Sequence, residues 1–297
     1  MQESGSIATG KLCIVPTPIG NLGDITLRAI EALEAADAIY AEDTRITGKL
    51  LAALGIEAAK PMRLDENTLT AKADEVAARV QAGETVAYCT DAGMPGVSDP
   101  GMRLVDAMYE HGLPVEVLPG ASAAACAYVA SGFATTAYYF GGFFPRKQSE
   151  RAATLQSLAT LDAALVFYES PNRLVSALRS IADAFPHREV AVCRELTKLH
   201  EEVLRLPASE AASQLETREQ TGRIKGEIAI VIDGPASDEE TERGASARAD
   251  ASAEAERLAR EGATQKSIAK ELSARFGIAR NDAYEIALAA RDAVDGA

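Results

Sequence analysis

The chain has 297 residues, which is long enough for two or three domains and a sizeable core. Its formal net charge of −14 excludes a protein coated in basic surface, so any nucleic-acid contact must come from a local cluster of Lys and Arg. The 47% apolar and 25% charged contents are ordinary for a soluble globular protein. Because no apolar run is long enough for a membrane span and the first ten residues lack a signal-peptide core, we expect a cytoplasmic protein.

The cysteines and histidines predict neither disulfides nor a metal site. All four cysteines fall in apolar strands or helices and form no CxxC pair, which is typical of buried thiols in a reducing compartment. They are Cys13, Cys89, Cys126 and Cys193. The three histidines lie far apart in the sequence, so we expect no bound metal.

Short apolar strands alternate with helices through the first half of the chain. Strands are predicted over residues 12–15, 38–40, 62–64, 86–89 and 114–118. Helices are predicted over residues 25–35, 47–54, 71–81, 102–111 and 121–131. Asp24 is the expected N-cap of the first helix. This alternation is typical of β-α-β units and a parallel sheet.

The pattern then restarts after residues 132–135. Further strands are predicted over residues 137–140, 165–168, 190–193, 202–206 and 227–232, and further helices over 149–159, 172–185 and 208–215. Residues 234–250 have no apolar periodicity and read as a linker. Helices over 252–260, 265–275 and 280–291, with a turn at Gly277, fit either a helix-turn-helix or a small structural bundle.

These elements predict five segments. They are a flexible tail (1–10), an N-terminal α/β domain (11–133), a second α/β domain (134–233), a linker (234–250) and a C-terminal helical domain (251–297).

The loop after residues 86–89 is the most suggestive of a binding site. It begins with Asp91 and is dense in glycine and proline. Parallel sheets bind ligands outside the carboxyl ends of their strands, and glycines let the backbone approach a ligand closely. A tight structural connection would have the same composition. Other motifs are absent: Asp43 stands where a P-loop before Gly48 and Lys49 needs glycine, and neither GxGxxG nor GxSxG occurs.

Seven segments together resemble one family. PTPIGNLGDITLRAIEAL, AEDTR, TDAGMPGVSDPG, PGASA, GFFPRK, VFYESPNR and RELTKLHEE occur in the order found in the ribosomal RNA small subunit methyltransferase I branch of the tetrapyrrole methylases. The resemblance covers about residues 11–233, and the last helices are similar to that branch's C-terminal domain. It implies two α/β domains with a cofactor cleft between them, followed by a small helical, helix-turn-helix-like domain.

The implied activity is S-adenosylmethionine-dependent methylation of the ribose 2′-hydroxyl of a cytidine in the decoding region of 16S rRNA. The implied partners are 16S rRNA or the small ribosomal subunit, and a second copy of the chain, because dimers are common in this superfamily. Residues implied to bind the cofactor are Thr17, Pro18, Gly20, Asp91, Gly93, Met94, Val97, Ser122, Ala123, Tyr168, Leu196 and Gly226. The branch often has a smaller polar residue in place of Met94, so only a backbone contact is expected there.

A 2′-hydroxyl is a weak nucleophile, so a base or polarising group is expected beside it. Glu42, Asp43, Glu169 and Glu195 all end strands, and we select Glu169 and Glu195 as the catalytic candidates. The residues expected to contact RNA are Arg45, Arg146, Lys147, Arg151 and Arg173. Basic groups next to Phe143 and Phe144 suit unstacked RNA bases.

Two other functions remain compatible with the sequence. A tetrapyrrole methyltransferase would use the same cleft on a precorrin- or uroporphyrinogen-type substrate. A non-enzymatic RNA-binding protein would use the C-terminal helices.

Overall fold

The first sheet is parallel and lies near the start of the chain. The computed structural model describes residues 10–99, 101–222, 224–235, 250–276 and 280–295, so most of the expected tail and linker and the turn at Gly277 lie outside the described residues. Strands β1 (Lys11–Ile14), β2 (Ala38–Ala41), β3 (Met62–Arg63), β4 (Thr85–Cys89) and β5 (Val115–Val117) form this sheet in the order β3-β2-β4-β1-β5. Every paired strand runs parallel, as the sequence predicts.

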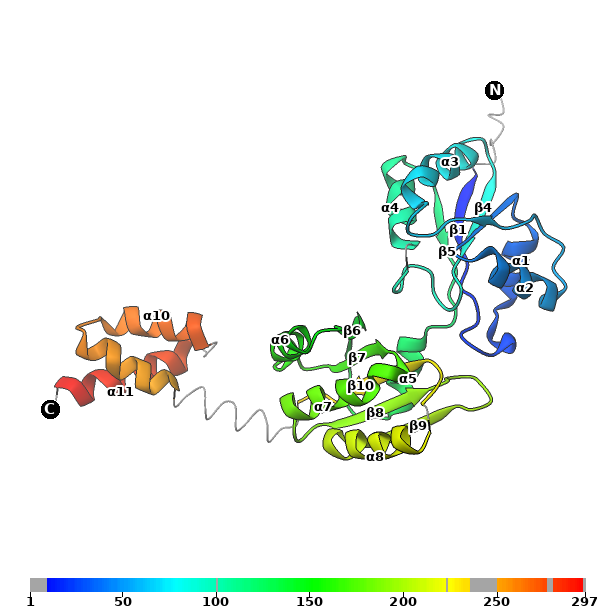
Figure 1. The fold of residues 1–297 in the computed structure, drawn as a ribbon. Coiled ribbons are helices and arrows are strands. Elements are labelled where there is room, and N and C mark those ends of the chain that lie inside the picture. The colour runs from blue at the N-terminus through cyan, green and yellow to red at the C-terminus, as the bar shows by residue number, and fades with distance from the viewer. Residues whose placement is uncertain (1–9, 100, 223, 236–249, 277–279, 296–297) are drawn as a thin grey trace, which may run out of the picture. The chain divides into compact units, whose positions relative to one another are not determined.

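Helices cover both faces of this sheet (Figure 1). Helices α1 (Leu27–Glu34) and α2 (Thr44–Leu54) pack on one face, and α3 (Leu69–Gln81) and α4 (Gly101–Glu110) pack on the other. The connection after β1 therefore leaves toward one face, whereas the connection after β4 leaves toward the opposite face. Neighbouring strands whose connections diverge in this way leave a crevice at their carboxyl ends, where α/β sheets bind ligands.

The expected cap of the first helix is wrong by two residues. Thr26 is the N-cap of α1, because its side chain accepts a 3.1 Å hydrogen bond from the backbone N–H of Ala29. Asp24 instead ends a short 3-10 helix (Leu22–Asp24) that begins after Asn21. The Thr26 hydroxyl thus satisfies an N–H of the first turn that would otherwise lack a partner.

The second sheet is mixed rather than wholly parallel. Strands β6 (Tyr138–Phe143), β7 (Ala164–Glu169), β8 (Glu189–Arg194), β9 (Glu202–Pro207) and β10 (Ile228–Ile232) form it in the order β6-β7-β10-β8-β9. Only the β6–β7 pair is parallel. Strand β10 runs antiparallel to both β7 and β8, and β9 runs antiparallel to β8. The start of β10 therefore lies at the same edge as the ends of β7 and β8.

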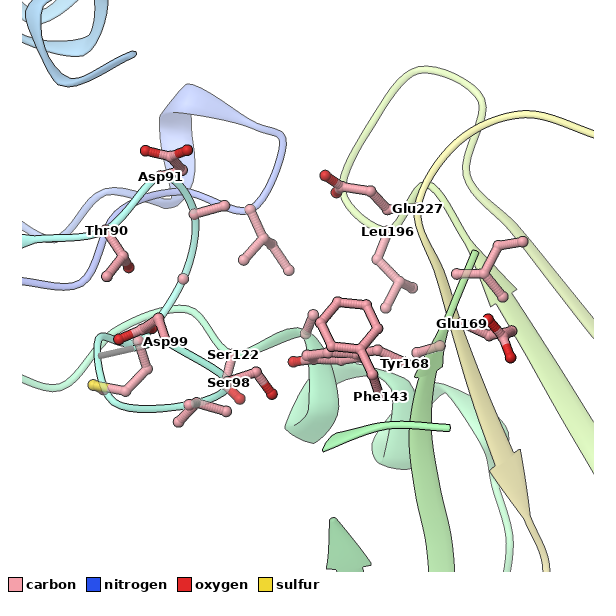
Figure 2. Close-up of a pocket in the computed structure, with 18 of the residues that line it drawn as sticks. Thr90, Asp91, Ser98, Asp99, Ser122, Phe143, Tyr168, Glu169, Leu196 and Glu227 are labelled. Carbon is pink, nitrogen blue, oxygen red and sulfur yellow. The ribbon is translucent and has the colours of Figure 1, made fainter. Parts of the chain in front are cut away.

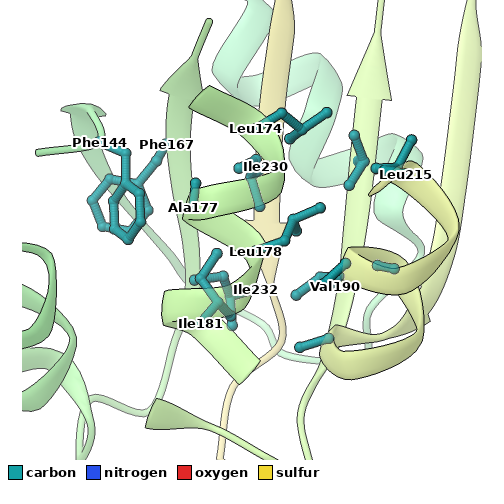
Figure 3. Close-up of a cluster of buried hydrophobic side chains, with 14 of the residues drawn as sticks. Phe144, Phe167, Leu174, Ala177, Leu178, Ile181, Val190, Leu215, Ile230 and Ile232 are labelled. Carbon is teal, nitrogen blue, oxygen red and sulfur yellow. The ribbon is translucent and has the colours of Figure 1, made fainter. Parts of the chain in front are cut away.

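Helices also cover this sheet on two sides. Helices α6 (Gln148–Leu158), α7 (Leu174–Ala184) and α8 (Ala208–Thr221) pack on one face, and Figure 3 shows α7 side chains against Ile230 and Ile232 of β10. Helix α5 (Ala123–Ser131) packs on the other face through Ala124 and Ala127. It therefore packs with the second sheet, although the expected boundary at residues 133 and 134 groups it with the first.

The C-terminal helices form their own small core. The chain divides into two compact units, with the boundary between Gly234 and Pro235. In the second unit, a helix over residues 250–260, α10 (Gln265–Phe276) and α11 (Arg280–Asp295) bury mainly alanines around Ile268 and Leu272. No described helix is both long and apolar enough to cross a bilayer.

Among the cysteines, Cys13, Cys89 and Cys193 are buried free thiols, as expected. Cys126 is also free but exposed, because it lies on the outer side of α5. The expectation that all four are buried is therefore wrong for Cys126.

Candidate functional site

A cavity of about 520 Å³ lies between the edges of the two sheets within the first unit. We call it the inter-sheet cavity. The loop after β4 forms one wall, and the ends of β7 and β8 with the start of β10 form the other (Figure 2). This volume is within the usual range for small-molecule and cofactor sites.

One wall of the inter-sheet cavity is acidic. Glu42, Asp91 and Asp99 line it, and two further carboxylates, Glu169 and Glu227, line the rest, whereas no lysine or arginine does so among the described residues. A pocket with this charge favours a cationic ligand over an anionic one.

Burial and mutual repulsion perturb these acids. Burial, followed by the charges of Asp91 and Asp99, raises the pKa of Glu42. Burial also raises the pKa of Asp91, although Asp91 accepts a 3.0 Å hydrogen bond from the backbone N–H of Asp43. Burial likewise raises the pKa of Asp99, which accepts a 2.6 Å hydrogen bond from the Gly96 backbone. A bound cation would offset the repulsion that Glu42 experiences from Asp91 and Asp99.

The opposite wall is largely apolar and aromatic. Phe143 meets the edge of Tyr168 with ring centroids 5.7 Å apart, and Figure 2 shows both rings beside Leu196. Flat apolar groups of this kind suit the face of a purine ring.

Leu196 is held at this wall by an unusual backbone. Its neighbours Glu195 (φ 52°) and Thr197 (φ 65°) both adopt the left-handed region, which non-glycine residues rarely occupy. Lys198 fixes the turn because its Nζ lies 2.8 Å from Oε1 of Glu195 and 3.0 Å from Oε2 of Glu227. Strain of this kind is concentrated at functional sites.

Two buried polar atoms on the cavity walls lack a hydrogen-bond partner among the described residues. They are Oγ1 of Thr90 and Oε2 of Glu169. Both atoms are buried, and leaving such atoms unsatisfied costs free energy. The acidic and aromatic walls fit S-adenosylmethionine, which carries positive charge, hydroxyls and a purine.

Most of the predicted cofactor residues line this cavity. These are Asp91, Gly93, Met94, Val97, Ser122, Ala123, Tyr168, Leu196 and Gly226. The other three, Thr17, Pro18 and Gly20, line a separate hollow of about 220 Å³ beside α2, which we call the α2 hollow. The loop that carries these three residues separates the two hollows, because Ile19 lines the inter-sheet cavity whereas Pro18 and Gly20 line the α2 hollow.

The two catalytic candidates differ in position. Glu169 lines the inter-sheet cavity, and its Oε1 lies 2.5 Å from Arg173 and accepts a 2.6 Å hydrogen bond from the Ser170 backbone. Glu195 does not line it. The hydrogen bond from Lys198 is the largest cause that lowers the pKa of Glu195, and its Oε1 is already occupied. Of these two candidates, only Glu169 has an oxygen at the wall without a hydrogen-bond partner among the described residues.

The predicted RNA-contacting residues are exposed to different extents. Arg146 is exposed and makes no ion pair or hydrogen bond among the described residues, and Lys147 is exposed and paired with Glu150 at 2.9 Å. The Arg45 side chain is 84% exposed and is paired with Asp43. These three residues are accessible to a large substrate.

Arg151 and Arg173 are largely inside the protein. Arg151 is only 7% exposed, and its guanidinium donates a 3.0 Å hydrogen bond to Oγ of Ser176. The Arg173 side chain is 26% exposed and is directed at Glu169. Neither guanidinium belongs to the exposed basic surface around Arg146.

Sequence reasoning did not identify several residues that line the inter-sheet cavity. They are Thr90, Ala92, Ser98, Asp99, Ser170, Pro171, Cys193, Glu227, Ile228 and Ala229. The second acid in TDAGMPGVSDPG could have indicated Asp99, because it precedes a Pro-Gly pair at the start of a helix. Glu227 and the first two residues of β10 reach the cavity through the reversed strand direction, which the sequence does not reveal. Within the described residues, no group of three or more His, Cys, Asp or Glu could hold a metal ion.

Comparison with known proteins identifies the family. Residues 11–212 match the model of the Tetrapyrrole (Corrin/Porphyrin) Methylases. The Ribosomal RNA small subunit methyltransferase I of Thermotoga maritima is 43% identical over 226 residues, which cover 76% of this chain and 99% of the relative. The protein of that name from Micromonospora olivasterospora is 36% identical over 285 residues, which cover 96% of this chain and 88% of the relative.

Solved structures show the same fold at low identity. Diphthine synthase has a TM-score of 0.58 at 15% identity, covering 75% of this chain and 90% of that one. A cobalt precorrin-4 methyltransferase has a TM-score of 0.55 at 17% identity, and the match covers 78% of this chain and 98% of that one. The predicted fold class is confirmed. The chain belongs to the tetrapyrrole (corrin/porphyrin) methylase family, within the ribosomal RNA small subunit methyltransferase I branch, and is an S-adenosylmethionine-dependent methyltransferase.

Proposed function

We propose that this chain transfers the methyl group of S-adenosylmethionine to the ribose 2′-hydroxyl of a cytidine in the decoding region of 16S rRNA. The observation that carries the proposal is the inter-sheet cavity, with carboxylates on one wall and aromatic side chains on the other. The substrate follows from the curated relatives, which are named as methyltransferases of small-subunit ribosomal RNA.

The donor supplies a methyl group already activated by its positive sulfur, so alignment of the acceptor oxygen provides much of the rate. Glu42 and Asp99 hold the positive charge. Tyr168 and Leu196 pack on the purine and exclude water from the reacting atoms.

Glu169 is the group that we assign to the acceptor hydroxyl. Its Oε1 is saturated by Arg173 and by the Ser170 backbone, so Oε2 is left to accept the hydroxyl proton's hydrogen bond. A carboxylate in this position would orient the oxygen lone pair and take up the proton as the new carbon–oxygen bond forms and the methyl–sulfur bond of the donor breaks. Glu195 has a different role in this proposal, which is to hold the turn that carries Leu196.

RNA contact in this proposal is made by exposed basic side chains near the cavity entrance. Phe143, the last residue of β6, lines the cavity and is 62% exposed, and Arg146 and Lys147 lie in the loop that follows it. An aromatic ring beside basic groups can stack an unpaired base and bind its phosphates. Arg45 is a further phosphate contact on the side of the first sheet.

We also propose a homodimer and a cytoplasmic location. Tyr138 and Tyr139 of the edge strand β6 are 42% and 41% exposed, and Val129 of α5 is 74% exposed. An edge strand with exposed aromatic side chains is normally covered. Light scattering of the full chain should give twice the monomer mass, and a monomer would contradict the dimer.

The proposed cytoplasmic location rests on the proposed ribosomal substrate.

The function is tested with methyl-labelled S-adenosylmethionine and three acceptors: small ribosomal subunits that lack the modification, protein-free 16S rRNA, and a uroporphyrinogen-type precursor. We expect label in RNA and none in the precursor. Label only in the precursor would assign the chain to tetrapyrrole chemistry. Binding of RNA without donor dependence and without product would indicate a non-enzymatic protein.

A further inference from the structure

The α2 hollow adjoins the inter-sheet cavity and is not used by the proposed donor site. It is lined by the loop after β1 and by α2, and it shares Thr90 and Asp91 with the inter-sheet cavity. A ligand in the hollow and a ligand in the cavity would therefore contact opposite sides of the same two residues. Because methyl transfer needs two molecules in adjacent sites, this arrangement suggests an acceptor site rather than part of the donor site.

The walls of the hollow match a flat aromatic group. Ile46 is 41% exposed and Leu22 is 40% exposed, and Leu50 and Pro18 complete an apolar lining. Exposed apolar side chains that converge on a hollow are a common feature of binding surfaces. Apolar side chains of this kind pack on the face of any nucleobase.

Two polar groups at the bottom of the hollow add selectivity. Thr90 is 2% exposed, and its Oγ1 has no hydrogen-bond partner among the described residues. Asp91 offers a carboxylate. Its Oδ1 already accepts a hydrogen bond from the Asp43 backbone N–H, so Oδ2 is the oxygen that would meet a base. A carboxylate can accept a hydrogen bond from the N4 amino group of cytosine. Uracil has a carbonyl oxygen at that position, which cannot donate such a bond. Arg45 lies in the same segment and is available for a neighbouring phosphate.

We infer that the α2 hollow holds the base of the target cytidine, unstacked from the RNA, while its ribose reaches the donor in the inter-sheet cavity. This inference rests on the proposed RNA substrate. It gives Thr17, Pro18 and Gly20 a place in acceptor binding rather than in cofactor binding. Enzymes that modify a nucleotide within structured RNA gain access by taking it out of the stack.

Two opposite changes to the hollow test the inference. In the full chain, Leu50→Trp should occupy the space of the base and Ile46→Ala should remove part of the surface on which the base packs, so each should raise KM for small ribosomal subunits by about fivefold or more. The Kd for S-adenosylmethionine, measured by calorimetry, should stay within twofold of the wild type. Leu27→Trp is the matched control, because Leu27 is 78% exposed on α1 and does not line the hollow.

The outcomes separate this inference from the proposed function. No methylation of subunits by the wild type would refute the function itself. An active wild type with unchanged KM in both variants, or a parallel loss of donor affinity, would refute the base site. Subunits reconstituted with uridine at the target position should be methylated at least tenfold more slowly. Equal rates on cytidine and uridine would overturn the assignment of Asp91.

Discussion

Arg173 and Glu169 form an ion pair of 2.5 Å at the point where β7 ends against the inter-sheet cavity. The pair occupies one oxygen of the carboxylate, and the other oxygen has no hydrogen-bond partner in the described part of the chain. Glu169 is 3% exposed, so this arrangement keeps a buried carboxylate oriented beside the site.

Glu169→Gln should lower the single-turnover methylation rate by about 100-fold, because an amide cannot take up the hydroxyl proton. The Kd for the donor should change less than threefold. Arg173→Ala should also slow the reaction, because the carboxylate loses its orientation. Arg179→Ala is the control, since this α7 arginine pairs with Glu216 on the protein surface. Full activity of Glu169→Gln would exclude Glu169 as the base.

Gly226→Ala should destabilise the protein and weaken donor binding. A Cβ at Gly226 would lie 2.5 Å from Cγ of Glu195, and the residue has φ 100°. We expect the free energy of unfolding to fall by about 1–3 kcal/mol, and Leu196 to shift with its turn. Gly112→Ala is the matched control, because Gly112 has φ 66° but open space around it. Denaturant unfolding and calorimetry measure both effects, and an unchanged donor affinity would contradict the account.

The acidic wall predicts opposite pH dependences for stability and donor binding. Burial raises the folded-state pKa of Glu42, Asp91 and Asp99 above their ordinary values of 4.5, 3.8 and 3.8. As pH rises from about 4, these three carboxyls lose their protons in the unfolded state before they do so in the folded state. The contribution of the three groups to folding stability therefore falls as pH rises through their folded-state pKa values. Affinity for a cationic donor should rise over the same window, because the carboxylates ionise.

Glu42→Gln isolates this effect. The variant should be more stable than the wild type near pH 7, because one of three half-buried carboxylates is neutralised. Its affinity for S-adenosylmethionine should be about tenfold lower, as expected for the loss of one charge-assisted contact. Exposed Glu57→Gln is the control. The account would be wrong if Glu42→Gln bound the donor as well as the wild type at pH 7.

Arg146→Ala and Lys147→Ala should each raise KM for small subunits by about threefold to tenfold and reduce the salt dependence of binding by about one counterion. Lys60→Ala is the control, because it also removes one positive charge from an exposed residue and Lys60 has no ion pair among the described residues. If all three variants behaved alike, the effect would be one of net charge and the loop would not be an RNA contact.

Arg151 should affect stability rather than RNA binding. It is buried without a carboxylate partner among the described residues. Arg151→Met should therefore be neutral or stabilising, since it replaces a desolvated charge with an apolar chain of similar length. Arg151→Ala should cost about 2–4 kcal/mol through lost packing. An increase in RNA KM for the folded Met variant would restore Arg151 as an RNA contact.

The order of elements could be predicted because each short apolar run is bounded by turn residues. The direction of strands in the second sheet could not. Ile228 to Ile232 is apolar throughout, and such a run fits a parallel or an antiparallel neighbour equally well. The antiparallel β10 is what brings Glu227 to the edge where Glu169 ends β7.

The candidate site could be predicted in part for a similar reason. Strand-end position and glycine content indicate Asp91 and Gly93, but they do not reveal on which side of a loop each residue faces. Pro18 and Ile19 are adjacent in the sequence and line different hollows. Burial also could not be foreseen for Arg151, which follows exposed basic residues in the same segment and turns into the protein.

The most direct test of the central claim is nucleoside mass spectrometry of small subunits incubated with S-adenosylmethionine and either the wild type or Glu169→Gln. The account predicts close to one 2′-O-methylcytidine per subunit with the wild type, at one position of the decoding region, and a strongly reduced yield with the variant. A methyl group on a base, on another nucleoside or on no RNA at all would contradict it.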